Sequence, residues 1–272
     1  MDAVKRTGGK APIPAQLLTL ALLVLPALVT WVLGSPSTAR IMQILLVVIA
    51  LLALLACWPF AGPGIPTDPD RGICALLGLI SMALIFLLPR SVGLDVSRGD
   101  GADLDAVWPL TRLWLESSAV LLTILAVVMF ARQMARKNRR MVIRGISATA
   151  LSGLAVVCAS GWVFLPAFCS LFARAAASAP LPAILTLVVG LVLLVGLVLA
   201  GWQWGRDLAG GLVDESGKAG RSGRTDQDTS SAYQVGSSDR TGGPAWFGMA
   251  LVPVMLSGAL VMLSITALHF LV

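Results

Sequence analysis

Charged residues are scarce in this chain. Asp, Glu, Lys and Arg make up 12% of its 272 residues, and 57% of the residues are hydrophobic. A soluble domain carries about 25% charged residues. Too little polar surface is left to cover a water-soluble globule of this length, so the composition excludes an ordinary soluble protein.

The residues that build common catalytic centres are also few. A single histidine excludes a bis-histidine haem within the chain, and the cysteines have no metal-ligand spacing. No Asp/Glu run is suited to holding magnesium against a diphosphate, and the P-loop, HExxH and GxSxG signatures are missing. We therefore predict no cofactor and no metal site, and read the four cysteines as small apolar residues of the helices: Cys57, Cys74, Cys158 and Cys169.

Long uncharged runs are what the sequence does contain. No charged side chain occurs from Gly145 to Ala173, or from Ala175 to Gly205. About 20 residues of helix cross a ~30 Å hydrocarbon core. The runs do not alternate as barrel strands do, and backbone groups in lipid must be paired within the segment. These runs predict transmembrane helices.

We predict an all-α integral membrane protein, a single-domain bundle of about seven transmembrane helices. A cleaved signal peptide is the alternative for the first span, but its apolar stretch is too long and no A-x-A site follows it. The predicted spans are residues 15–34, 41–59, 72–89, 113–131, 145–168, 182–204 and 246–270.

The basic residues predict the orientation. With the N-terminal tail, residues 1–14, in the cytoplasm, fifteen basic residues lie inside and five outside. The C-terminus is then extracytoplasmic. Because the net charge of +6 sits in loops between apolar spans, it predicts topology rather than a nucleic-acid partner. A multi-pass protein of the plasma membrane follows, and the excess of Arg over Lys, sixteen to four, is compatible with a GC-rich bacterial genome.

Two inside loops have distinct compositions. Residues 206–244 are rich in Gly, Ser, Thr, Asp and Arg, and we predict that they are disordered. The loop after the fourth span is basic and should bind anionic lipids of the inner leaflet, at ~1 kcal/mol for each cation. It also suits a cytoplasmic protein partner, although topology setting explains the same charges. Its basic residues are Arg132, Arg136, Lys137, Arg139, Arg140 and Arg144.

Tryptophan prefers the membrane–water interface. We predict that all eight tryptophans lie at or beside the ends of spans, with Trp108, Trp114 and Trp162 near outer ends.

Glu116 is the only acidic residue inside a predicted span. Ionisable groups in membrane helices are costly and usually face the protein interior. We predict Arg112, one turn away, as its charge partner, and His269 as a group that could face it from the last span. These three residues are candidates for binding a ligand or proton; the alternative is that they reach water or headgroups at the interface.

The poverty of polar groups within the spans favours a non-enzymatic accessory, assembly or scaffold component of a membrane complex, with another protein as partner. A transporter or permease subunit for an apolar or lipid-like substrate is the first alternative. The second is a membrane enzyme acting on a lipid carrier, with active groups in the acidic segment Asp100–Asp105.

Overall fold

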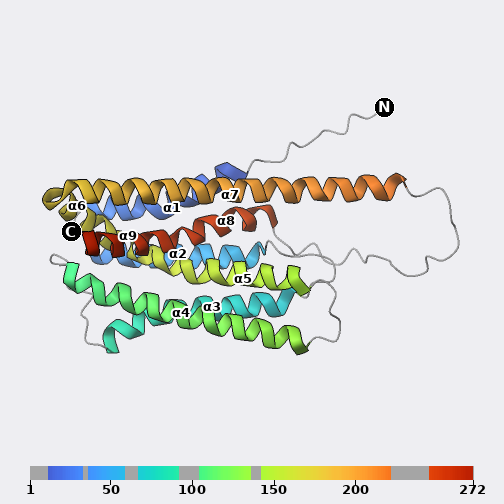
Figure 1. The fold of residues 1–272 in the computed structure, drawn as a ribbon, viewed down its shortest axis with the longest axis horizontal. Helices are drawn as coiled ribbons and strands as arrows, with labels where there is room; N and C mark the ends of the chain where they lie inside the picture. The colour runs from blue at the N-terminus through green and yellow to red at the C-terminus, as the bar shows by residue number, and fades with distance from the viewer. Residues whose placement is uncertain are drawn as a thin grey trace.

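The computed structural model describes residues 12–32, 36–58, 67–91, 104–135, 142–221 and 245–271, and every regular element in these ranges is a helix. The helices lie side by side along one long axis, and α1 begins at the opposite end of the bundle from the end of α9 (Figure 1). Their bounds are α1 Pro12–Val32, α2 Pro36–Ala56, α3 Thr67–Ser91, α4 Leu104–Ala135, α5 Val142–Ala159, the 3₁₀ helix η1 Ser160–Phe164, α6 Leu165–Ser178, α7 Pro180–Arg221, α8 Ala245–Leu256 and α9 Gly258–Leu271.

Four stretches of the described residues are long and apolar enough to cross a membrane. They are Trp108–Arg132 in α4, Ile146–Ser178 in α5–η1–α6, Pro180–Gln203 in α7 and Phe247–Leu271 in α8–α9. The apolar parts of α1 and α2 are shorter. The predicted all-helical membrane protein is thus confirmed at this coarser level, with four candidate spans.

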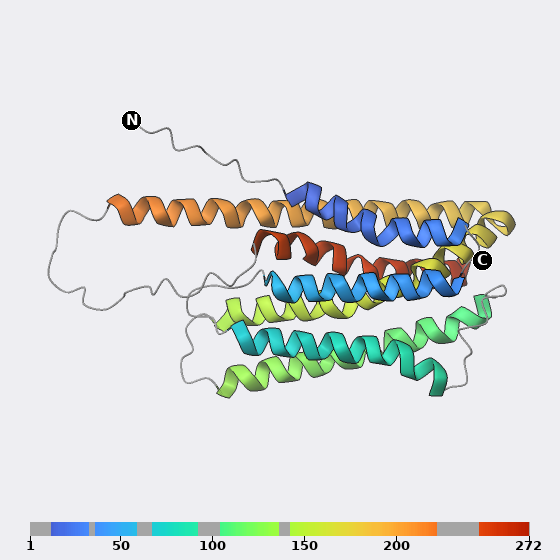
Figure 2. The same cartoon turned by 180° about the vertical axis from the view of Figure 1, so that it is seen from behind.

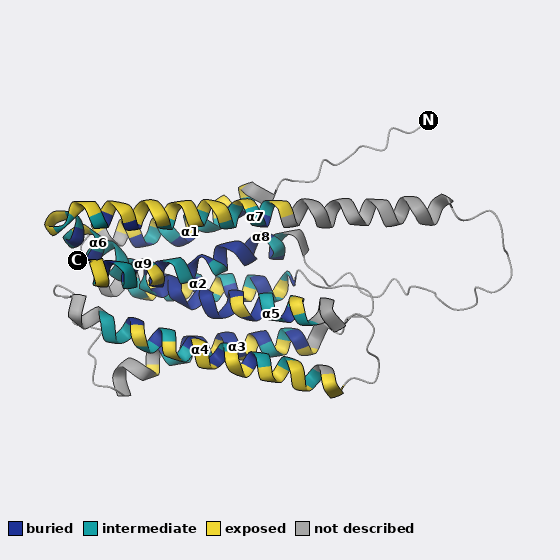
Figure 3. Ribbon diagram, in the orientation of Figure 1, coloured by how far each residue is buried: buried dark blue, intermediate teal, exposed yellow. Residues whose placement is uncertain are grey.

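Burial separates central helices from peripheral ones. In the apolar stretches, 67% of α5–η1–α6 and 61% of α8–α9 is buried, against 22% of α4 and 11% of α7. Figure 3 shows this pattern, with α7 and α4 at opposite edges of the bundle and α5 and α8 between them. Seen from behind, the hairpin of α1 and α2 lies against α7 and α8 (Figure 2). The core therefore centres on α5–η1 and α8–α9.

The helical stretch α5–η1–α6 bends near residue 168, where the predicted fifth span ends. Pro166, at the start of α6, has no N–H to continue an α-helix, so the preceding turn tightens into η1. The N–H of Leu165 donates to the carbonyl of Trp162, which closes the bend. Because α6 then continues the helical path, the apolar stretch ends at Ser178 rather than at residue 168.

α7 is the longest of the described helices, at 42 residues. At 1.5 Å per residue it is about 63 Å long, about twice the ~30 Å hydrocarbon core, and it extends beyond the other helices (Figure 1). Residues 206–221, predicted to be disordered, continue α7, which corrects that part of the prediction. No proline follows Pro182 until Pro244, and Asp214 and Lys218 have the i, i+4 order that favours a helix. Residues 222–244 lie outside the described ranges.

Candidate functional site

The predicted pair of Arg112 and Glu116 is present on α4. The Nε atom of Arg112 donates to the Oε1 atom of Glu116 over 2.7 Å. The two side chains are 69% and 58% exposed, so they point away from the bundle. This geometry contradicts the expectation that an ionisable group in a span faces the protein interior, because the inward face of α4 is occupied by other residues.

His269 does not face Glu116. Its ring stacks on Trp108, with 4.5 Å between ring centroids and 6° between ring planes, and Phe270 meets Trp108 edge-on. Trp108 lies eight residues before Glu116, which is about 12 Å along a helix. The contact therefore joins the N-terminal part of α4 to the end of α9, and the three candidate residues do not form one site.

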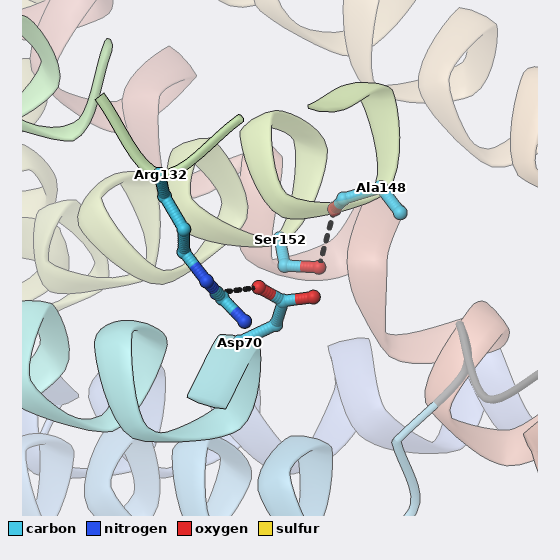
Figure 4. A network of polar contacts seen from close by, with 4 residues as sticks. All are labelled: Asp70, Arg132, Ala148 and Ser152. Carbon is cyan, nitrogen blue, oxygen red and sulfur yellow. Dashed lines mark hydrogen bonds and ion pairs between the residues drawn. The ribbon is translucent and has the colours of Figure 1, made fainter. Parts of the chain in front are cut away.

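Arg132, predicted to belong to the membrane-surface loop, is the last basic residue of α4 and forms an ion pair with Asp70 of α3. Its side chain is 23% exposed and that of Asp70 is 8% exposed. Figure 4 shows the Asp70 carboxylate beside Ser152 of α5, whose hydroxyl donates to the carbonyl of Ala148 over 2.7 Å. The pair thus links the ends of α3 and α4 where both pack on α5.

The other five basic residues of this loop have no side chain that the structure describes. Four of them, Arg136, Lys137, Arg139 and Arg140, lie outside the described residues, as does the side chain of Arg144. The acidic segment Asp100–Asp105 likewise falls on residues whose side chains are not described. Among the described residues, no group of three or more His, Cys, Asp or Glu side chains is arranged to hold a metal ion.

The centre of the bundle contains two helix interruptions that face each other. Ser257 separates α8 from α9, and Gly258 meets η1 so closely that a Cβ on Gly161 would lie 2.3 Å from the carbonyl oxygen of Gly258. Only glycine permits such an approach of two backbones. Trp162, predicted near the outer end of a span, is buried at this crossing and lies midway along the apolar stretch Ile146–Ser178.

Side chains replace the backbone hydrogen bonds lost at the interruption. The Trp162 indole donates to the carbonyl of Val254 over 2.9 Å, and the Ser257 hydroxyl donates to the same carbonyl over 2.6 Å. The Trp114 indole donates to the Ser160 hydroxyl over 2.8 Å, and that hydroxyl donates to the carbonyl of Val157. These bonds tie α4, η1 and α8 together, as expected where polar groups are sealed from water.

Two buried glutamines were missed by the sequence analysis. Gln16 and Gln43 are 0% exposed, and among the described residues neither amide has a hydrogen-bond partner. Gln16 lies where α1 meets α7 and α8: a Cβ on Gly201 would be 2.7 Å from its Nε2 atom and 2.2 Å from Pro253. The sequence does contain the signal, because an amide inside an apolar run is expensive in lipid, and the two glutamines are exceptions to the poverty of polar groups within the spans.

The cavity beside Trp114 is small. It has a volume of about 20 Å³ and is lined by side chains of α3, α4 and η1, among them Ile85, Ser117 and Phe164. This is room for about one water molecule. The cavity does not provide a substrate site.

Comparisons with known proteins add no relative: no protein-family model, curated protein or solved structure matches this chain.

Proposed function

We propose that this protein is a non-enzymatic component of a membrane complex, which acts through contacts between membrane helices. In this proposal the chain crosses the plasma membrane seven times, with α1, α2 and α3 completing the four longer spans. The N-terminus lies in the cytoplasm and the C-terminus outside.

The observation that carries the proposal is the direction of the polar groups. Serine and threonine hydroxyls within the helices are mostly bonded to carbonyls one turn earlier in their own helix, as at Thr186 and Thr266. The charged pair in the apolar stretch of α4 instead points out of the bundle. Charge that faces outward at membrane depth favours a partner over an internal reaction site.

The test removes this pair and measures what remains bound. We expect the wild-type chain, purified in mild detergent from its native membrane, to retain a stoichiometric protein partner or a further copy of itself. The Arg112→Leu/Glu116→Leu double variant should lose most of the bound partner or second copy. Val192→Ala on the outer surface of α7 is the control and should retain it, since Val192 is 64% exposed and apolar.

Quantitative mass spectrometry of the three preparations decides the outcome. If all three hold the same proteins in the same amounts, the outward pair plays no part in assembly. If the wild type yields only a single chain that binds no other protein, the proposed function is contradicted.

Transport is the second candidate function, and the buried amides of Gln16 and Gln43 favour it. Facing helix interruptions and unpaired polar groups inside a bundle are features of transport paths. Pro253 also has no N–H for the carbonyl one turn before it, and it lies next to Gln16. On this hypothesis, water or a small solute reaches Gln16.

Cysteine accessibility tests this alternative. In a background with the four native cysteines replaced by alanine, Gln16→Cys should react with a small charged methanethiosulfonate reagent in membranes. Leu18→Cys, on the exposed side of α1 at 69% exposure, should not react, because lipid excludes the reagent. An unreactive Gln16→Cys would argue against an aqueous path at this position.

A further inference from the structure

One face of α4 points directly away from the bundle and contains an unusual set of residues. Its members recur at helical spacing and are exposed; we call it the α4 outward face and define it as Arg112, Glu116, Ala119, Thr123 and Val127. The opposite side of the helix is buried and consists of Thr111, Trp114, Ser118, Leu121 and Leu125. Because the two stripes lie on opposite sides of one helix, α4 has one side committed to the bundle and one free to meet another molecule.

The charged pair lies so far along the apolar stretch of α4 that contact with lipid alone would not satisfy this face. The apolar stretch of α4 runs from Trp108 to Arg132, and Glu116 lies about 12 Å along the helix from its outer end. Arg112 does not extend toward the outer surface, as an isolated arginine near a helix end would. Its Nε atom instead bonds to Glu116, one turn deeper.

The pair also leaves hydrogen-bonding capacity unused. The guanidinium has five N–H donors and the carboxylate has two acceptor oxygens, while a single bond joins Arg112 to Glu116. Lipid tails supply no partners for the rest. A polar surface of complementary charge at the same depth would satisfy them.

A second copy of the same helix has that charge pattern. Two copies related by a two-fold axis along the membrane normal place α4 beside α4 in parallel, at equal depth. Arg112 of each copy then meets Glu116 of the other, so the same ion pair forms twice across the contact. Ala119 and Thr123, four residues apart on the same face, are small enough to let the two helices approach closely.

The exposed surface of α7 provides the contrast. It is more extensive, but the exposed residues from Leu181 to Leu199 are all apolar, Val192 among them. Lipid satisfies such a surface completely. A partner is therefore needed at α4 and not at α7.

We propose that the α4 outward face is the interface with a second copy of this chain, in which Arg112 and Glu116 exchange ion-pair partners across a two-fold axis. This inference rests on the proposed function and deepens it, because it identifies the partner that the outward charged pair binds.

The test is disulfide cross-linking in native membranes. In the background without native cysteines, Ala119→Cys places one thiol at the centre of the face, and copper phenanthroline should convert the chain to a covalent dimer. Val192→Cys on α7 is the matched control, since residue 192 is also exposed but lies on the other edge of the bundle; it should remain monomeric.

Charge-reversal variants then distinguish a loss of ion pairing between two copies from a loss of folding stability. Added singly to Ala119→Cys, Arg112→Glu and Glu116→Arg should each lower the cross-linked fraction on the order of tenfold, about the effect of one strong interhelical polar contact. The first variant has two acidic groups on the face and the second has two basic groups. When the two are coexpressed with different affinity tags, the mixed dimer should return to the wild-type fraction, which a misfolded variant could not produce.

The outcomes are distinct. Recovery in the mixed dimer supports the interface. Absence of a cross-link at residue 119, with a different protein cross-linked there instead, overturns self-association while leaving the proposed function in place. A chain that is monomeric in membranes and cross-links to nothing overturns both.

Discussion

At the residue scale, two glycines decide how closely the central helices pack. A Cβ on Gly258 would lie 2.2 Å from the carbonyl oxygen of Cys158, and one on Gly161 would be nearly as close to the backbone of Gly258. Backbone atoms cannot rotate away as a side chain can. The crossing of η1 with α9 therefore depends on the absence of side chains at both positions.

Gly258→Ala should lower the free energy of unfolding by about 2 kcal/mol, the typical cost of overpacking a core. Gly196→Ala on α7 is the matched control, because nothing lies within 4 Å of a Cβ there, and it should leave stability unchanged or slightly higher. Thermal unfolding of the purified variants in detergent measures both. Equal stability of the two variants would mean that the backbones at the crossing can separate without cost.

Much at the residue scale could not be read from the sequence. The Arg112–Glu116 pair was predicted because the residues are one helical turn apart. The Asp70–Arg132 pair joins residues 62 positions apart, and no local pattern indicates which helices become neighbours. The stacking of His269 on Trp108 was missed for the same reason.

At the scale of elements, the ion pair between Asp70 and Arg132 connects α3 to α4. These two helices form an edge of the bundle, and α3 packs mainly on α4 and α5. A buried carboxylate without its cation is strongly unfavourable. The pair therefore holds the ends of α3 and α4 in register against α5.

Arg132→Gln should destabilise the protein by about 3 kcal/mol, the lower end of the range for breaking a buried ion pair, because Arg132 is partly exposed. The double variant Asp70→Asn/Arg132→Gln should regain part of this loss, since no buried charge is left unpaired. Arg71→Gln is the control, because Arg71 forms no ion pair among the described residues. A double variant less stable than Arg132→Gln would contradict this account.

The ends of two spans were predicted correctly from composition, because the thickness of the lipid bilayer sets the length of an apolar helix. The predicted span 182–204 and the stretch Pro180–Gln203 nearly coincide, as do 246–270 and Phe247–Leu271. The prediction was wrong where the chain bends without leaving the bundle, at η1 and Pro166. Hydropathy does not detect such bends, because every residue around them is apolar or small.

At the scale of the whole molecule, the orientation of the chain decides which side of the membrane each loop reaches. The predicted arrangement places residue 103 outside the cell and residue 230 inside. A cysteine introduced at Asp103 should react with a membrane-impermeant maleimide in intact cells, and a cysteine at Ser230 should react only after the cells are opened. The reverse labelling pattern would show that the orientation is inverted, with each loop on the opposite side of the membrane from the one predicted.

The central claim is that this protein works by binding other membrane helices and not by turning over or carrying a substrate. Native mass spectrometry of the wild-type chain released from its membrane tests it most directly. A single chain has a mass of 28.4 kDa, so the measured mass gives the number of chains and any bound molecule. We expect a complex of two or more chains that contains no stoichiometric small molecule. A single chain with one tightly bound lipid or solute would contradict the claim and favour the transport alternative.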